Sequence, residues 1–329
     1  MYKIHALRKP AAMLLCLLLL SLSLCIYAAP ADSADGRDAT AAYLLSALPS
    51  PAPGDIGGDW VVLGLKQSGI SLPDGYTAAY LAQLEQELAA ADGIFNGRKY
   101  TAYSRTILTL SALGEDPYTA AGFNFVKKLG EFDSVMRQGV NGSIYALMAL
   151  DSLQAPAPQE WTDTYLKAIL DAQNPDGGFG LSPGVSETDL TAMSLQALAG
   201  HMDRRDVKAA VCTALRYLSA ALQTDGAFSS YGVANAESAA QVILGLHAVG
   251  IPLTDSRFVL DGKTALDQLN QFRCESGGYR HTAETDENLM ATQQALLALN
   301  AAAEPVAEPV PNTLLEYMIF APDAEIQYN

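Results

Sequence analysis

A repeat of about 50 residues constrains the fold of this 329-residue chain more than any other feature of its sequence. Three segments align by eye, at 170–200, 221–250 and 271–300. Each begins with a polar stretch and continues through a Gly-bearing turn that ends in an aromatic residue. A second polar loop and an acid then lead into an apolar helix. A self-similar period of this length predicts stacked supersecondary units.

The recurring residues mark the same structural point in every repeat. The aromatic residues are Phe179, Phe228 and Tyr279, and the acids are Glu187, Glu237 and Glu287. The pairs Asp176-Gly177 and Asp225-Gly226 favour tight turns with positive φ. We therefore expect the glycines to form turns and the aromatic rings to fill the gaps between neighbouring hairpins.

Helical patterns extend the repeat over most of the chain. Helices that are apolar nearly all round, as at 237–249, are expected to start near residues 59, 101, 141, 187, 237 and 287. Helices of a second kind are expected at 38–48, 76–91, 118–129, 162–172, 207–222 and 262–272. The example at 207–222 has one apolar stripe, so one of its faces is in water, whereas a helix apolar all round is buried on several sides.

This alternation of helix types predicts an all-α fold, the α6/α6 toroid, in which six helical hairpins form two concentric rings. An open α-solenoid is the alternative, and it needs capping repeats with polar outer faces. The toroid is expected to occupy residues 32–300. A Pro-rich acidic linker at 301–312 and a short tail of unknown role at 313–329 follow it.

The first 31 residues have the pattern of an export signal. Lys3, Arg8 and Lys9 precede an apolar run, and small residues suited to cleavage follow it. The run is about 16 residues, shorter than the roughly 20 of a spanning helix. We expect a secreted or cell-surface protein, and an uncleaved leader is the one expected route to a membrane.

Charge excludes one class of partner. The chain has 36 Asp and Glu against 20 Lys and Arg, for a net charge of −16. Nucleic-acid binding requires Lys and Arg to neutralise phosphates, so no nucleic-acid partner is expected. The expected partner is a small-molecule ligand or another protein.

Two segments resemble a known family. QNPDGGF at 173–179 resembles the Gln-x-x-x-Gly-x-aromatic repeat of squalene cyclases and protein prenyltransferase β subunits. LGEDPYTAAGFNFVKKL at 113–129 resembles secreted bacterial members of that superfamily. The resemblance covers about residues 38–300 and implies the terpenoid-cyclase/prenyltransferase α/α toroid. Transcobalamin and intrinsic factor share this toroid and bind corrinoid, so no cofactor is expected but a corrinoid is possible as a ligand.

The catalytic motifs of these relatives are missing from the sequence. It has no Asp-x-Asp-Asp acid and no Cys-Gly-Glu-Gln thioester motif. Neither Cys212 nor Cys274 belongs to the Asp-x-Cys zinc motif. The two cysteines are also expected to differ in height by roughly 10–15 Å, too far apart for a disulfide.

Polar residues at the starts of the inner helices are the candidate ligand-binding groups. They are Asp59, Tyr103, Asn141, Glu187, Asp189, Glu237, Glu287 and Asn288. Parallel inner helices would bring these residues to one rim of the ring. The alternative is helix capping, because acids in a first turn suit the helix dipole. Asn235 and Thr285 are expected N-caps, and Ser186 with Asp189 resembles a capping box.

Two main functions remain open. The first is an exported, non-catalytic protein whose central cavity binds a hydrophobic or corrinoid-like small molecule, or a partner peptide. The second is an enzyme, either a divergent cyclase- or prenyltransferase-like protein or a carbohydrate-active one, that uses the rim carboxylates. A bare structural module with a filled ring is a third. A cavity of about 300–1,000 Å³ would argue against a filled ring, and a buried rim acid beside a second carboxylate would favour an enzyme.

Overall fold

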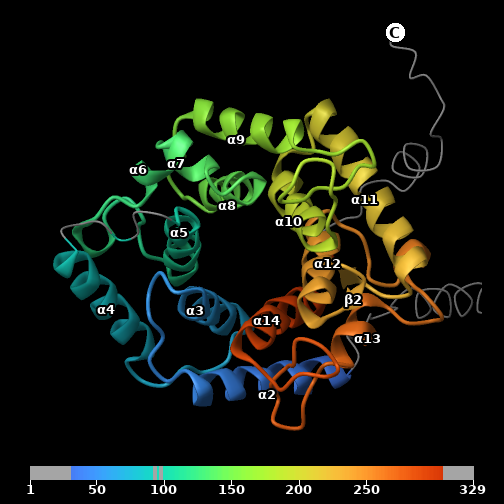
Figure 1. The fold of residues 1–329 in the computed structure, drawn as a ribbon. Coiled ribbons are helices and arrows are strands. Elements are labelled where there is room, and N and C mark those ends of the chain that lie inside the picture. Colours follow the sequence, from blue (N-terminus) through green and yellow to red (C-terminus); the bar gives the residue numbers. More distant parts are fainter. Residues whose placement is uncertain (1–30, 92–94, 96–98, 307–329) are drawn as a thin grey trace, which may run out of the picture.

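The computed structural model describes residues 31–91, 95 and 99–306, and six of its helices surround the centre of the molecule (Figure 1). These are α3 (Ile56–Ser68), α5 (Thr101–Leu113), α8 (Val140–Asp151), α10 (Thr188–Leu198), α12 (Ala236–Ala248) and α14 (Leu289–Ala303). Each starts within a few residues of a predicted inner helix, which confirms that part of the prediction.

The ring closes between the two ends of the chain. Helix α14 packs against α12 on one side and against α3 on the other. Gly64 of α3 leaves room for Leu296 and Leu297 of α14. The Asn300 side chain donates from Nδ2 to the carbonyl of Gly64 at 2.9 Å, across 236 positions of sequence. The fold is therefore a closed toroid, as predicted, and not an open solenoid.

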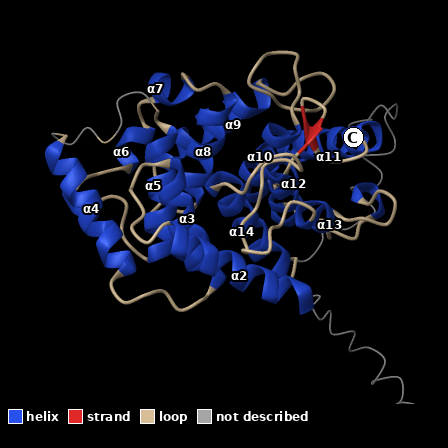
Figure 2. Cartoon of the chain, turned by 60° about the horizontal axis from the view of Figure 1, so that its bottom comes forward, coloured by secondary structure: helices blue, strands red, loops and turns tan. Residues whose placement is uncertain are grey.

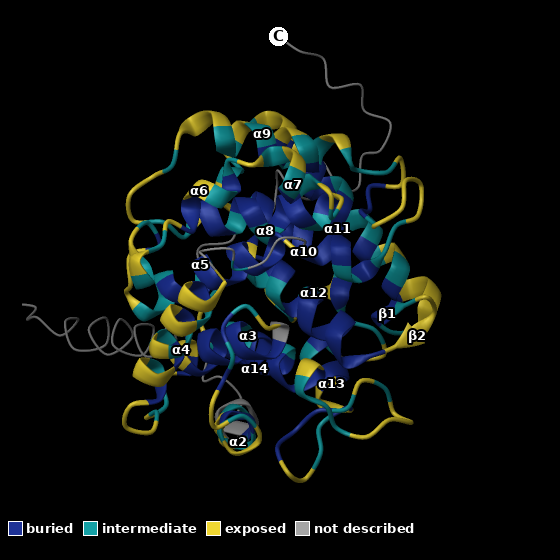
Figure 3. Ribbon diagram, turned by 60° about the vertical axis from the view of Figure 1, so that its left-hand side comes forward, coloured by how far each residue is buried: buried dark blue, intermediate teal, exposed yellow. Residues whose placement is uncertain are grey.

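Outer helices surround this ring, and they are less buried than the inner helices. They are α2 (Ala31–Ala47), α4 (Tyr76–Ala90), α9 (Gln159–Asp171), α11 (Arg205–Asp225) and α13 (Ala265–Asn270). Figure 3 shows the inner helices mostly buried and the outward sides of α4 and α9 exposed. Along α11, one stripe is buried and the opposite face is wet, as its sequence pattern predicts.

The prediction of the third outer helix is wrong, because residues 118–129 do not form one continuous helix. Short pieces take its place: η1 (Ala120–Gly122), α6 (Val126–Leu129) and α7 (Phe132–Met136). Ala121 and Gly122 have φ of 52° and 69°, and such left-handed residues interrupt an α-helix. Phe123 and Phe125 pack edge to face there, with ring centroids 4.9 Å apart. The sixth outer helix, α13, is shorter than predicted.

The remaining elements are small. Two-residue strands β1 (Ser229–Ser230) and β2 (Val233–Ala234) pair antiparallel, and short 3₁₀ helices η2 (Ala199–His201) and η3 (Ser256–Phe258) follow α10 and α12. Tyr231 and Gly232 connect the strands with φ of 51° and 76°, the left-handed pair that a tight hairpin requires. Figure 2 shows this hairpin and a neighbouring loop projecting together beyond the helices.

The glycine turns behave as predicted. Gly177, Gly226 and Gly277 have φ of 89°, 76° and 91°, and Gly226 is the left-handed C-cap of α11. A Cβ at Gly177 would lie 2.4 Å from the backbone oxygen of Thr213, so the turn needs glycine both for its conformation and for close packing. The rings of Phe179 and Tyr279, which end two of these turns, are fully buried.

Several expectations concern residues that lie wholly or mainly outside the described ones. These are the leader at 1–31, the tail at 313–329 and the second half, 307–312, of the linker at 301–312. Helix α14 itself continues to Ala303. Cys212 is buried in α11, Cys274 is half-buried after α13, and both are free thiols. In the described part of the chain, no helix has the length and apolar character needed to cross a membrane.

Candidate functional site

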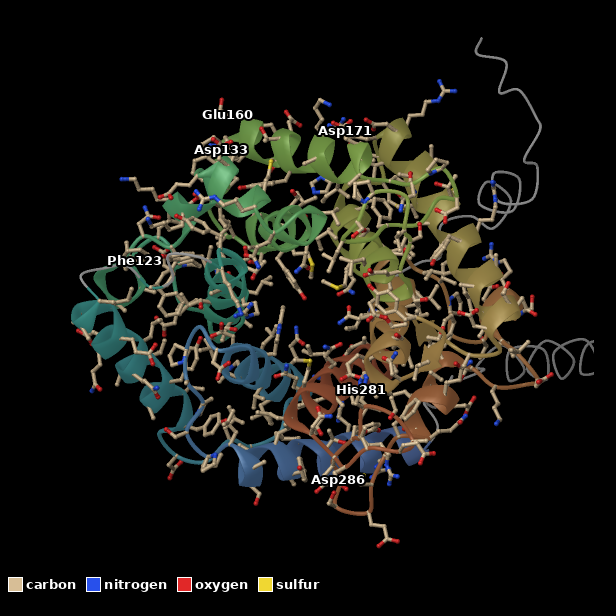
Figure 4. The ribbon with its side chains drawn as sticks, in the orientation of Figure 1. Phe123, Asp133, Glu160, Asp171, His281 and Asp286 are labelled. Carbon is tan, nitrogen blue, oxygen red and sulfur yellow. The ribbon has the colours of Figure 1, made fainter. Side chains whose placement is uncertain are left out.

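One cavity of about 390 Å³ lies on the axis of the ring, and all six inner helices contribute to its lining. Figure 4 shows side chains of these helices directed toward the central opening. The lining residues come from the middle and C-terminal parts of the helices. This volume falls in the range of small-molecule sites, which argues against a ring filled by side chains.

The lining is largely apolar. Leu63, Met148 and Leu297 are typical members, and the rings of Trp60 and Tyr145 pack in it with centroids 5.6 Å apart. Burial raises the pKa of Tyr145 to about 12, so its phenol stays neutral near pH 7. Among the described residues, the lining contains no carboxylate, amine, guanidinium, imidazole or thiol. It can bind neutral groups but has no group suited to proton transfer at ordinary pH.

Three glutamines form a chain of hydrogen bonds along the cavity wall. Gln196 of α10 donates from Nε2 to Oε1 of Gln241 of α12 at 2.8 Å. Gln241 in turn donates to Oε1 of Gln294 of α14 at 3.0 Å. Each amide has one donor and one acceptor end, so the chain has one direction across three helices. The chain uses neither the Oε1 acceptor of Gln196 nor the Nε2 donor of Gln294, and both residues line the cavity.

Asp59, the first predicted rim residue, is instead a core residue. It is fully buried, and its carboxylate accepts hydrogen bonds from the Gly54 amide at 2.9 Å and from the Tyr80 hydroxyl at 2.7 Å. Nε of Arg105 lies 3.7 Å from it. Burial raises the pKa of Asp59 to about 6, and these partners lower it. The carboxylate is occupied within the protein and does not belong to the cavity lining.

Tyr103 and Asn141 also lie apart from the rim acids. The Tyr103 ring is buried among aromatic residues, stacked near Phe123 with centroids 6.4 Å apart, and it does not line the cavity. Asn141 is in the first turn of α8, four residues before Tyr145 and so on the same helix face. Its Oδ1 is buried without a hydrogen-bond partner.

Glu187, Asp189 and Glu237 are brought together at the rim. Glu187 accepts a hydrogen bond from Tyr231 at 2.8 Å, Asp189 from Ser238 at 2.5 Å, and Glu237 contacts Nδ1 of His281 at 2.7 Å. Burial is the main cause that raises the pKa of Asp189. The Ser238 hydrogen bond lowers that pKa, and the charges of Glu237 and Glu187 raise it.

This acid group lies next to the cavity. Asp189 precedes the lining residues Met193 and Gln196 by four and seven positions on α10. Glu237 precedes Gln241 and Leu244 by the same intervals on α12. Residues at these spacings share a helix face. The two carboxylates therefore lie about one helical turn from the cavity, toward the rim where the inner helices begin.

The last two predicted residues have local roles. Glu287 accepts a hydrogen bond from the Ser276 hydroxyl and lies near Tyr43, whose pKa is raised by burial and by the charge of Glu287. Asn288 is the N-cap of α14 and accepts from the Ala291 amide at 2.9 Å. Thr285 is therefore not the cap, contrary to prediction.

Of the other two capping predictions, one is confirmed and one is wrong. Asn235 caps α12 through the Ser238 amide at 2.8 Å, as predicted. The capping box expected from Ser186 and Asp189 is wrong. Glu187 occupies the N-cap position of α10 and makes no side-chain cap bond, and Ser186 binds Asp176 instead.

A comparison with protein-family models identifies the family to which the chain belongs. A family model described as the prenyltransferase alpha-alpha toroid domain matches residues 124–251 and 242–319, together more than half of the chain. The chain belongs to this family. No curated protein matches it.

Zinc, which prenyltransferases of this toroid family use, does not fit the residues present. Cys212 is buried on an outer helix, and Cys274 lies after another outer helix; neither lines the cavity. Among the described residues, no group of three or more His, Cys, Asp or Glu side chains is placed to hold a metal ion.

The sequence pattern did not predict the glutamine chain. Gln196, Gln241 and Gln294 occur within apolar helices, where an isolated amide carries no motif. Their spacing held a signal. They follow Asp189, Glu237 and Glu287 by seven, four and seven residues, intervals that keep a residue on or near the face of its rim acid.

Proposed function

We propose that the chain is an exported binding protein whose central cavity holds a small neutral molecule without transforming it. The observation that carries this proposal is the neutral lining of a cavity of about 390 Å³. An apolar pocket with a few placed polar groups is typical of ligand binding. Acid–base catalysis needs a titratable group within hydrogen-bond reach of the reacting atoms, and the described lining offers only the neutral phenol of Tyr145.

The glutamine chain supports a ligand that carries neutral hydrogen-bonding groups. The Gln196 acceptor and the Gln294 donor match a donor and an acceptor on one molecule, such as those of an amide or of a hydroxyl beside a carbonyl. A ligand with a net charge would lose its hydration without gaining an ionic partner, which is unfavourable. The lining therefore favours neutral amphiphilic molecules over diphosphates or fatty acids.

A corrinoid fits this proposal in one respect. Its peripheral amides would pair with the glutamine amides, but a corrinoid is larger than the cavity and would insert only one edge. A partner peptide would likewise enter only by a side chain or a terminus. A small amphiphile that fills the cavity is the better match in size.

The test is native mass spectrometry of the full chain with a panel of cobalamin, cobinamide, isoprenoid diphosphates, the corresponding neutral isoprenoid alcohols and neutral oligosaccharides. We expect a retained adduct with a neutral, amide- or hydroxyl-bearing probe and none with the diphosphates. Retention of a diphosphate, or of no probe, would contradict the proposal.

A matched pair of variants ties binding to the cavity. Gln241→Glu places a charge in the glutamine chain, and we expect it to weaken the adduct at least about tenfold, equivalent to about 1.4 kcal/mol. Gln154→Glu makes the same chemical change on an exposed residue outside this cavity and is expected to leave binding unchanged. Equal weakening by both variants would place the ligand elsewhere.

A second candidate function has one observation in its favour. Asp189 has a raised pKa and lies beside Glu237 and Glu187, an arrangement that suits a general acid. A carbohydrate-active enzyme would use such a pair. This candidate requires conversion of an oligosaccharide probe by the wild-type chain and loss of that conversion in Asp189→Asn. Unconverted probes throughout would leave the binding protein as the better proposal.

A further inference from the structure

The large hydrophobic residues that are exposed gather on one side of the molecule. In the described part of the chain these are Leu181, Val185, Tyr231, Val233 and Met290, and the Tyr231 side chain is 82% exposed. All five lie just before or at the start of α10, α12 and α14. Scattered exposed apolar residues need no explanation, but a group on one face of a protein marks an interaction site.

Hydrogen bonds join the segments that carry these residues into one surface, which we call the hairpin rim (residues 180–189, 229–238 and 280–290). The Tyr231 hydroxyl donates to Glu187, which links the second segment to the first. The Ala236 amide donates to the His281 carbonyl at 3.0 Å, which links the second to the third. Antiparallel bridges also close the loops of the first and third segments. One pairs Phe179 with Glu187, and the other pairs Arg280 with Glu287. The apolar residues therefore stand on a connected support and not on separate loops.

The hairpin rim is also strongly acidic. It contains six carboxylates, from Glu187, Asp189, Glu237, Glu284, Asp286 and Glu287, and its basic residues are Arg280 and His281. Arg280 turns back into the protein, where it approaches the Ala283 carbonyl at 3.3 Å and the Cys274 sulfur at 3.6 Å. Figure 4 shows Asp286 farther from the central opening than His281. The field over the apolar residues is therefore negative.

We infer that the hairpin rim is a docking surface for a cationic amphipathic segment of another protein, one in which Lys or Arg residues alternate with apolar ones. The apolar residues of the rim would bury those of the segment, and the exposed carboxylates of Glu284 and Asp286 would pair with its cations. An anionic membrane surface is disfavoured by the same charges. This surface is separate from the cavity lining, so the inference does not rest on the proposed ligand.

The test measures binding of the full chain to a labelled synthetic peptide of about 18 residues, in which Lys and Leu are placed to give an amphipathic helix. A second peptide has Glu at every Lys position. Fluorescence anisotropy is expected to show binding of the Lys peptide only. Binding should weaken as ionic strength rises from about 0.05 to about 0.3 M, because exposed charge pairs are screened.

Variants separate the hairpin rim from the overall negative charge of the chain. Leu181→Asn with Val185→Asn removes two exposed apolar side chains and keeps the hydrogen bond between Tyr231 and Glu187. We expect this pair to weaken binding about tenfold or more, in line with loss of central apolar contacts. Glu284→Gln with Asp286→Asn should weaken it as well. Glu160→Gln with Asp171→Asn removes the same charge from the outward side of α9, seen in Figure 4, and should have little effect.

Four results would overturn the inference. The first is no difference between the peptides, with either no binding of the Lys peptide to the full chain or equal binding of the Glu peptide. The second is an α9 control variant that weakens binding as much as the rim variants do, which would reduce the effect to net charge. The third is a dimer in light scattering that the Leu181 and Val185 variant abolishes, which would assign the surface to a second copy. The fourth is binding to vesicles of phosphatidylserine and phosphatidylcholine through the same two residues, which would assign the surface to a membrane.

Discussion

The two halves of the toroid use the same position of the inner helices in different ways. In the first half, Asp59 at the start of α3 is fully buried and bound by Gly54, Tyr80 and Arg105. In the second half, Asp189 and Glu237 at the starts of α10 and α12 remain at the rim. Equivalent positions in a repeat thus contain a core residue on one side of the ring and rim residues on the other.

The difference arises from the segments that precede the helices. Before α3, the chain folds back so that the Gly54 amide donates to Asp59 and the Gly54 carbonyl accepts from Arg105 at 3.0 Å. Before α10 and α12, hairpins extend over the rim and supply Tyr231 as a partner there. A repeat therefore fixes where a helix begins, and its neighbouring loop decides whether the first polar side chain is buried.

The largest expected effect is loss of stability in Asp59→Ala. Removal of one partner from a buried ion pair leaves Arg105 without its counter-charge and leaves the Gly54 amide and Tyr80 hydroxyl without an acceptor. We expect a loss of about 3–5 kcal/mol in the free energy of unfolding, measured by denaturant titration. Asp189→Ala, the matched change in the second half, should cost much less. Equal losses would mean that the two halves do not differ.

The pH dependence of stability provides the next prediction. Because burial raises the pKa of Asp59 from 3.8 to about 6, the folded state binds this proton more tightly than the unfolded state does. The stability that Asp59 contributes is then fully present below about pH 4, falls as pH rises to about 6, and is constant above. At about 1.4 kcal/mol per pKa unit the change is about 3 kcal/mol.

Asp59→Asn isolates this contribution. The difference in unfolding free energy between the wild type and Asp59→Asn should move in favour of the variant by that amount between pH 4 and pH 6.5, roughly spanning the two pKa values. A difference that stays constant with pH would show that the Asp59 carboxylate titrates as it does in the unfolded chain.

The toroid could be predicted from sequence because its signal is repeated. Six apolar helices with the same preceding pattern outweigh any local ambiguity, and all six occur where they were expected. The third outer helix failed because its segment has no aligned copy. Its helical appearance was overridden by the left-handed backbone at Ala121 and Gly122 and by the packing of Phe123 and Phe125.

The candidate site was less accessible to prediction. The predicted starts of the inner helices identify which residues lie near a rim. Whether such a residue is buried depends on its tertiary partners. Asp59 contacts Tyr80 and Arg105, which belong to other helices. The grouping of Asp189 with Glu237 followed from the parallel helices. The glutamine chain did not, because a neutral amide in an apolar helix has no distinctive pattern until the facing helices are known.

Helix capping gives a smaller, local comparison within the second half. Asn235→Ala removes the side-chain acceptor of the Ser238 amide, and Asn288→Ala removes that of the Ala291 amide. Each should cost about 1 kcal/mol in thermal or chemical unfolding. Glu187→Ala is the control, because Glu187 occupies an N-cap position without a side-chain cap bond. A similar loss there would show that the Tyr231 contact, and not capping, stabilises this rim.

The smallest expected effect is that of Glu237→Gln. The amide oxygen of glutamine can still accept from Nδ1 of His281, and that imidazole is about half exposed, so water can replace any lost interaction. We expect a change within about 0.5 kcal/mol, the size typical of a substitution that breaks no buried interaction, by the same denaturant titration. Glu237 is itself only 8% exposed, which makes this the sharpest test of the contrast with Asp59. A loss of several kcal/mol would mean that the charge of Glu237 stabilises the core, and that the second half of the ring uses its rim acids as the first half uses Asp59.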